Sequence, residues 1–169
     1  MDTGLLIVRL VVGLTLAGHG VQKLFGWFEG PGLSGTATGF EGKGYQPGRW
    51  FAAAAALAEA IGGLLLAIGL LMPLTTAVVI ADMVAAALST HATNGFWLTK
   101  GGYEYTLVLG GVAAGLAFTG AGGYSVDHLL GWNLGGIWWG ELSLALAIAA
   151  SMVIEVYRHQ RLARPRAVA

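Results

Sequence analysis

Residues 50–71 read WFAAAAALAEAIGGLLLAIGLL, an almost unbroken apolar run that holds a single charged residue, Glu59. A helix of about 20 apolar residues rises about 30 Å, which is the thickness of the hydrocarbon core of a bilayer. The run therefore predicts a helix that crosses a membrane.

Four other apolar runs flank this stretch. The first run carries charges but has no basic segment ahead of it, so we expect a spanning helix and not a signal peptide. Pro73 separates the central run from the next one, because proline lacks a backbone donor and disfavours helix in the residue before it. The four runs cover about residues 4–27, 74–92, 103–118 and 136–157. The sequence thus predicts an all-α, polytopic membrane helical bundle.

The composition agrees with a membrane protein and excludes several other classes. Of the 169 residues, 56% are hydrophobic and 11% are charged, against roughly a quarter charged in an average soluble domain. Nine basic residues balance nine acidic ones, which argues against nucleic acid as a partner. The chain has no cysteine, so it forms no disulfide, thiolate metal site or iron–sulfur cluster. Any redox chemistry therefore needs a bound cofactor or a partner protein.

The distribution of basic residues predicts the topology. Lys and Arg in short loops stay on the cytoplasmic side of a membrane. With five spans, all the basic residues outside the helices fall on one side, whereas the turn at Pro73 and residues 119–135 hold none. We therefore expect five spans, with the N-terminus outside and the C-terminus in the cytoplasm. The one-sided set is Lys43, Arg49, Lys100, Arg158, Arg161, Arg164 and Arg166.

Small residues four apart predict close packing between helices, because they let backbones approach one another. These pairs are Ala58 and Gly62, Ala81 and Ala85, Gly111 and Gly115, and Ala145 and Ala149. Such faces are equally suited to a homo-oligomer.

Ionisable side chains at membrane depth are costly unless they are paired or hydrated, so each is a candidate functional residue. Counting along the helices places His19 and Glu59 at similar depth, and makes Asp82 a partner for Arg9 or Lys23. The group in the cytoplasmic half comprises His19, Lys23, Glu59, His91 and Glu104. Structural ion pairs that fix the helix register are the alternative interpretation.

A cluster of histidine, lysine and glutamate side chains is suited to hold and protonate a polar head group. A quinone is the lipid-soluble candidate, because its reduction couples electron transfer to proton uptake. A haem between His19 and His91 is a further alternative, since their estimated depths differ by only about 5 Å. We expect no metal and no nucleotide, because GKG at residues 42–44 lacks the P-loop spacing and follows no strand.

Four segments together carry a resemblance to a known family. They are RLVVGLTLAGHGVQKLFGWFEGPGLSGTATGFEGKGYQPG (9–48), AEAIGGLLLAIGLLMPL (58–74), HATNGFWLTKGGYEY (91–105) and GAGGYSVD (120–127). In this order they resemble the DoxX family of small bacterial integral membrane proteins, over about residues 5–131. The family's polar motif positions fall here on Arg9, His19, Lys23, Glu59, His91, Asn94, Glu104 and Asp127.

The resemblance implies a bundle with four membrane helices in a bacterial cytoplasmic (inner) membrane. It implies association with thiosulfate oxidation linked to quinone in some members, and with oxidoreductase complexes for thiol and oxidant stress in others. We expect a DoxX-like four-helix domain over residues 1–131, a fifth transmembrane helix over 132–158 and a basic cytoplasmic tail over 159–169.

Two loops have predicted roles. Residues 28–48 hold seven glycines and are long for a simple helix connection, so we expect a re-entrant or interfacial lid over the inner site. A flexible cytoplasmic loop is the alternative. In GYSVD, Ser125 or Asp127 is expected to cap a short helix or to anchor the outer loop.

The predicted function is that of a quinone-interacting subunit of a membrane oxidoreductase system. In this prediction Lys23, His19 and Glu104 bind the head group, and Glu59 or Asp82 relays protons. His91 and Asn94 complete the head-group set. The chain has no haem, flavin or iron–sulfur signature, so the electrons come from a small reductant or from a soluble or membrane partner. The alternatives are a non-enzymatic scaffold that recruits soluble oxidoreductases and a small proton-coupled permease.

Overall fold

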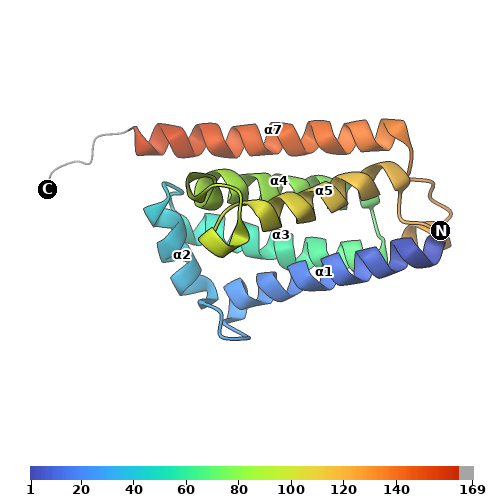
Figure 1. The fold of residues 1–169 in the computed structure, drawn as a ribbon, viewed down its shortest axis with the longest axis horizontal. Helices are drawn as coiled ribbons and strands as arrows, with labels where there is room; N and C mark the ends of the chain where they lie inside the picture. The colour runs from blue at the N-terminus through green and yellow to red at the C-terminus, as the bar shows by residue number, and fades with distance from the viewer. Residues whose placement is uncertain (164–169) are drawn as a thin grey trace, which may run out of the picture.

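A computed structural model describes residues 1–163, so that Arg164 and Arg166 lie outside the described residues. All regular elements in this part of the chain are helical, and the long helices run side by side (Figure 1). The long helices are α1 (Asp2–Phe25), α3 (Gly48–Ile68), α4 (Met72–Ala86), α5 (Glu104–Thr119) and α7 (Ile137–Leu162). The short elements are α2 (Gly32–Gly42), η1 (Ala87–His91), η2 (Ala92–Asn94), η3 (Leu98–Lys100) and α6 (Val126–Leu129). The predicted all-helical bundle is confirmed.

Four helical segments are long and apolar enough to cross a membrane. They are Asp2–Phe25, Gly48–Ile68, Met72–Asn94 and Ile137–Leu162. The C-terminal helix is therefore one of the long ones. In contrast α5, expected as a full span over residues 103–118, has 16 residues. At about 1.5 Å per residue it extends about 24 Å, less than the thickness of the hydrocarbon core.

Large apolar side chains cover the outer surface of the bundle. They include Ile7, Val11 and Leu14 on α1, Leu57, Ile61 and Leu64 on α3, Leu107 and Val108 on α5, and Ile148, Met152 and Val153 on α7. A soluble monomer rarely exposes apolar surface on this scale, whereas lipid is the expected neighbour of such helices. The protein is therefore a multi-pass membrane protein.

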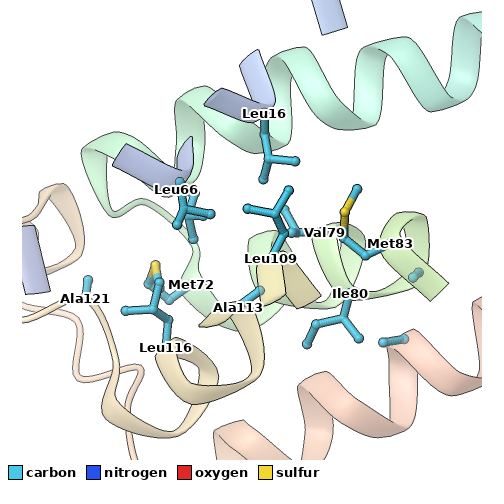
Figure 2. Close-up of a cluster of buried hydrophobic side chains, with 13 residues drawn as sticks. Leu16, Leu66, Met72, Val79, Ile80, Met83, Leu109, Ala113, Leu116 and Ala121 are labelled. Atoms are coloured by element: carbon cyan, nitrogen blue, oxygen red, sulfur yellow. The ribbon is translucent and has the colours of Figure 1, made fainter. Parts of the chain in front are cut away.

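The core lies where α1, α3, α4 and α5 meet (Figure 2). Leu16 of α1 and Leu66 of α3 face Val79 of α4 and Leu109 of α5 in this cluster. Helix α7 adds Ala147 from the far side and packs against both α4 and α5.

The closest helix contact is between α1 and α3. A Cβ atom on Gly13 would lie 2.5 Å from the Gly63 carbonyl oxygen, and one on Gly63 would lie 2.5 Å from the Ala17 nitrogen. Real Cβ atoms do not approach so closely, so both positions require glycine. A Cβ atom added to Gly111 or Gly115 would have no neighbouring atom within 4 Å, so this part of the packing prediction is wrong.

The two ends of the bundle differ in charge. The N-terminus lies at one end, and α2, the start of α3 and the end of α7 lie at the other, which we call the α2 end (Figure 1). The described basic residues outside the helix interiors lie just after α2, at the start of α3, before α5, or near the end of α7. They are Lys43, Arg49, Lys100, Arg158 and Arg161, and they fall at the α2 end, as the five-span prediction requires.

Candidate functional site

A cavity of about 570 Å³ lies between α3, α4 and α7. The segment after α2 reaches over it, so that Phe40, Lys43 and Tyr45 line its wall at the α2 end. The rest of the wall is mostly alanine and aliphatic, and it includes Ala54, Ala55 and Ala58 of α3, Ala77, Val78, Ala81 and Ala85 of α4, and Leu146, Ala150 and Ile154 of α7. The cavity is large enough for a small organic ligand, for which sites measure roughly 300–1,000 Å³.

A three-residue charge cluster lies at the edge of this cavity. Lys23 of α1 forms an ion pair with Glu59 of α3, and only 6% of the Glu59 side chain is exposed. Asp82 of α4 lines the cavity and is close enough to interact with both Lys23 and Glu59. Three helices therefore contribute one charge each to a common cluster.

The cluster is incompletely hydrogen-bonded. Glu59 Oε2 and Asp82 Oδ2 are both buried and accept no hydrogen bond from a donor among the described residues, and the two carboxyl groups lie close enough to share a proton. A buried carboxylate oxygen without a donor is costly, so these two atoms mark a place where a ligand donor or a proton is stabilising. Two carboxylates face one ammonium, and a single added proton makes the cluster neutral.

A second polar group lines the cavity nearer the α2 end. Lys43 donates a hydrogen bond of 3.0 Å to Thr90 Oγ1, and among the described residues it forms no ion pair with a carboxylate. Burial lowers the pKa of Lys43, and the positive charge of Lys23 lowers it further. Ser89, Thr90 and His91 lie on η1, a π-helical turn that continues α4, and all three line the cavity. Such turns often occur at functional sites, because they change the direction in which side chains point.

Tyr45 and its hydrogen bonds cover the α2 end of the cavity. Tyr45 is 2% exposed and donates a 2.8 Å hydrogen bond to Glu155 of α7, which also forms an ion pair of 2.7 Å with Arg158. Burial raises the pKa of Tyr45 to about 12. The segment expected as a lid is thus a helix, α2, followed by a hydrogen-bonded turn, and it is ordered rather than a loose loop.

His19 occupies a different place from the one expected. Its ring nitrogens lie 3.1 Å from Gln22 Oε1 and 3.3 Å from the Tyr105 hydroxyl, and it does not line the cavity. The expected partnership between His19 and Glu59 is wrong, because Glu59 is paired with Lys23.

Asn94 and Glu104 also lie away from the cavity. The Asn94 amide donates to the Gly101 carbonyl at 3.2 Å, and Glu104 accepts from the Leu98 backbone N–H at 2.9 Å. His91 Nδ1 lies 2.7 Å from the same Gly101 oxygen. These side chains organise the loop between α4 and α5, and of the three only His91 reaches the cavity wall.

Arg9 lies toward the N-terminal end, remote from the carboxylate proposed as its mate. Its side chain is 0% exposed and donates to the Ala121 carbonyl at 2.7 Å and to the Tyr124 carbonyl. Of the two partners expected for Asp82, Arg9 is wrong, because both of its terminal guanidinium nitrogens donate to backbone carbonyls of the loop after α5, whereas Lys23 does lie near Asp82. Arg9 ties α1 to this loop.

The outer loop is anchored by Asp127 and Ser125 as the sequence suggests. Asp127 accepts hydrogen bonds from the backbone N–H groups of Leu71 at 2.8 Å and Met72 at 3.1 Å, where α4 begins. Ser125 caps α6 by accepting from the His128 N–H at 3.2 Å. Asp127 therefore has a structural role, which is to hold the outer loop against the start of α4.

Sequence reasoning assigned no binding role to Lys43, Ser89 or Thr90. In the sequence, Lys43 indicates only topology, although its place in a long glycine-rich segment beside the inner cluster is a clue to a binding role. Ser89 and Thr90 carried no such clue. Among the described residues, no group of three His, Cys, Asp or Glu side chains is placed to hold a metal ion.

Comparison with known proteins gives one result for the family. The sequence profile described as DoxX matches residues 4–92, more than half of the 169-residue chain. The match covers Lys23, Glu59, Asp82 and His91, and it ends before α5. Searches of curated proteins and of solved structures found no match. The chain therefore belongs to the DoxX family.

Proposed function

We propose that the cavity binds the head group of a membrane quinone, and that the protein acts as the quinone-interacting subunit of an oxidoreductase system. One observation carries the proposal: an apolar cavity of ligand size ends on a cluster of one lysine and two carboxylates with two unpartnered buried oxygens. A quinone needs an apolar site, a donor to its ring oxygens and a source of protons.

The residues have distinct roles in this proposal. Lys23 donates a hydrogen bond to a ring oxygen, and His91 provides a second polar contact toward the α2 end. Asp82 and Glu59 supply and receive protons, because they adjoin Lys23 at the cavity edge. His19, Asn94 and Glu104 lie outside the lining and hold neighbouring structure.

Reduction of a quinone to a quinol consumes two electrons and two protons. The carboxylates account for the protons, and the electrons come from a thiol, thiosulfate or a partner oxidoreductase. We place the protein in the bacterial cytoplasmic membrane with its N-terminus outside, because the described basic residues gather at the α2 end. The proton cluster then lies in the cytoplasmic half.

The test is a titration of the purified protein, in lipid nanodiscs, with a quinone carrying a short alkyl tail. Asp82→Asn keeps the shape of the side chain but removes its charge, and Lys23→Met removes the donor; each should weaken binding at least tenfold. Glu104→Gln is the matched control, because Glu104 contacts only the loop, and should leave the affinity within twofold.

Two outcomes oppose the proposal. Saturable binding that is equal in wild type, Asp82→Asn and Lys23→Met would place the quinone elsewhere. Absence of saturable binding in the wild type would favour the scaffold, whose charge cluster is purely structural.

A further inference from the structure

We infer that the cavity takes its ligand sideways from the bilayer, through an opening between α3 and α7, and that the ligand is an amphiphile whose long apolar tail lies in that opening. The inference rests on the proposed function and adds the class of ligand and its route. Three observations support it: the contacts between the helices, the exposure of cavity residues toward lipid, and the aromatic cover at the α2 end.

Helices α3 and α7 line two sides of the cavity, and α4 lines its base. Both helices pack against α4. At the α2 end they meet through the rings of Phe51 and Tyr157, whose centres are 5.3 Å apart. Beyond this contact the cavity separates α3 from α7.

Several residues line the cavity and are also exposed on the outside of the bundle. Ala54 of α3 and Ala150 of α7 are exposed, Leu146 is 46% exposed and Leu74 is 55% exposed. A residue with both properties lies on a rim, so these four mark an opening on the lipid-facing side. The rim is apolar, as required of a passage for hydrocarbon.

At the α2 end, aromatic rings cover the cavity, and the lining residues there are buried or only partly exposed. Rings of Phe40, Tyr45, Phe51 and Tyr157 follow one another at centre distances of 5.3 Å. Hydrogen bonds from Tyr45 to Glu155 and from Tyr157 to the Gln46 carbonyl tie the segment after α2 to α7. A ligand from water would have to break this closure, whereas a ligand from lipid would not.

The small side chains that line the cavity favour binding of a ligand with a hydrocarbon tail over binding of a compact ring alone. Alanine occupies several of the lining positions of α3 and α4, so these walls leave room for a flexible chain. A hydrocarbon chain fills such a space through dispersion and burial of its methylene groups. The polar head then reaches Asp82 and Lys23, and the tail leaves past Ala54 and Ala150.

The experiment compares two quinones with the same ring, one with a decyl tail and one without. Affinities are measured in nanodiscs of one lipid composition for wild type, Ala150→Trp and Ala149→Trp. Ala150 lines the cavity, whereas its neighbour Ala149 is exposed on the same helix but does not line it. Ala150→Trp should weaken decyl-quinone binding at least tenfold and ring-only binding less than twofold. Ala149→Trp should change neither.

A second measurement uses the unaltered protein. A decyl-quinone with a diazirine at the tail end is photolysed, and the labelled peptides are identified by mass spectrometry. Label on α3 and α7 that excess decyl-quinone suppresses supports the inference. Suppressible label confined to α1 and α5, or decyl-quinone affinity unchanged in Ala150→Trp, would overturn the lateral route while leaving quinone binding intact. Absence of saturable binding for both quinones would reject the proposed function and, with it, the route.

Discussion

Arg9 should be the most sensitive single position for stability at the N-terminal end of the bundle. Its guanidinium is fully buried, lies against Gly69, and donates to the carbonyl oxygens of Ala121 and Tyr124. Replacing it in Arg9→Met keeps an apolar stem of similar length but leaves two carbonyls without donors. Hydrogen bonds from a charged group contribute about 1.5–3 kcal/mol each, so the variant should lose about 3–6 kcal/mol.

The assay is unfolding in mixed micelles by increasing SDS, followed by tryptophan fluorescence and far-ultraviolet circular dichroism. Arg49→Met is the matched control, because Arg49 is exposed at the start of α3 and its replacement should cost less than about 0.5 kcal/mol. A free energy of unfolding for Arg9→Met within 1 kcal/mol of the wild type would refute the reasoning, since the loop after α5 would then be held by other contacts.

Three further predictions concern the rest of the bundle. Lys23→Met should lower the free energy of unfolding by about 2–4 kcal/mol, because Glu59 is left buried and unpaired. Adding Glu59→Met should restore most of this loss. A double variant no more stable than Lys23→Met alone would contradict the prediction. Gly63→Ala should lower the free energy of unfolding by about 1–3 kcal/mol, because the added methyl group overpacks against α1. Gly115 has open space around it, so Gly115→Ala should be neutral or slightly stabilising in the same SDS titration. Equal effects of the two substitutions would be inconsistent with the α1–α3 contact. Burial raises the pKa of Tyr45 to about 12, so the unfolded chain loses this proton at a lower pH than the folded protein does. The free energy of unfolding should therefore fall by up to about 3 kcal/mol as the pH rises from about 10 to about 12 in the wild type, but not in Tyr45→Phe. Parallel pH profiles of the two proteins would argue against the covered α2 end.

The membrane bundle itself is readable from the sequence because of a strong physical constraint. In lipid, the backbone groups must be satisfied within the helix, so an apolar run of sufficient length has few alternatives. This is why residues 50–71 and 136–157 predict helices correctly. The bounds of α5 were readable as well, since the run predicted at 103–118 differs by one residue at each end from the observed helix Glu104–Thr119, and its 16 residues are too few for a full span.

The members of the charge cluster were predictable, but their partners were not. Counting residues along a helix gives depth, and depth places Lys23, Glu59 and Asp82 in one region. It does not tell which helix faces which. Arg9 shows the limit most clearly, since its partners are carbonyl groups of a glycine-rich loop, and no rule that matches acids with bases identifies them.

Two structural features were not identified from the sequence. The tight α1–α3 contact joins Gly13 and Ala17 of α1 to Gly63 and Ala67 of α3, which are pairs of small residues four apart, but the spacing rule does not rank these pairs above Gly111 and Gly115, which have no near neighbour. The π-helical turn at Ala87–His91 changes which side chains face the cavity, and a regular 3.6-residue period does not anticipate it.

The central claim is that Lys23, Glu59 and Asp82 form the polar end of a quinone site. The most direct test is to purify wild type and Asp82→Asn in mild detergent from the same host, record visible spectra, and extract each sample for lipid-soluble quinones. The account predicts near-stoichiometric quinone in the wild type, severalfold less in Asp82→Asn, and no Soret band in either. Quinone at the level of empty micelles in both preparations, or a Soret band from bound haem, would contradict it.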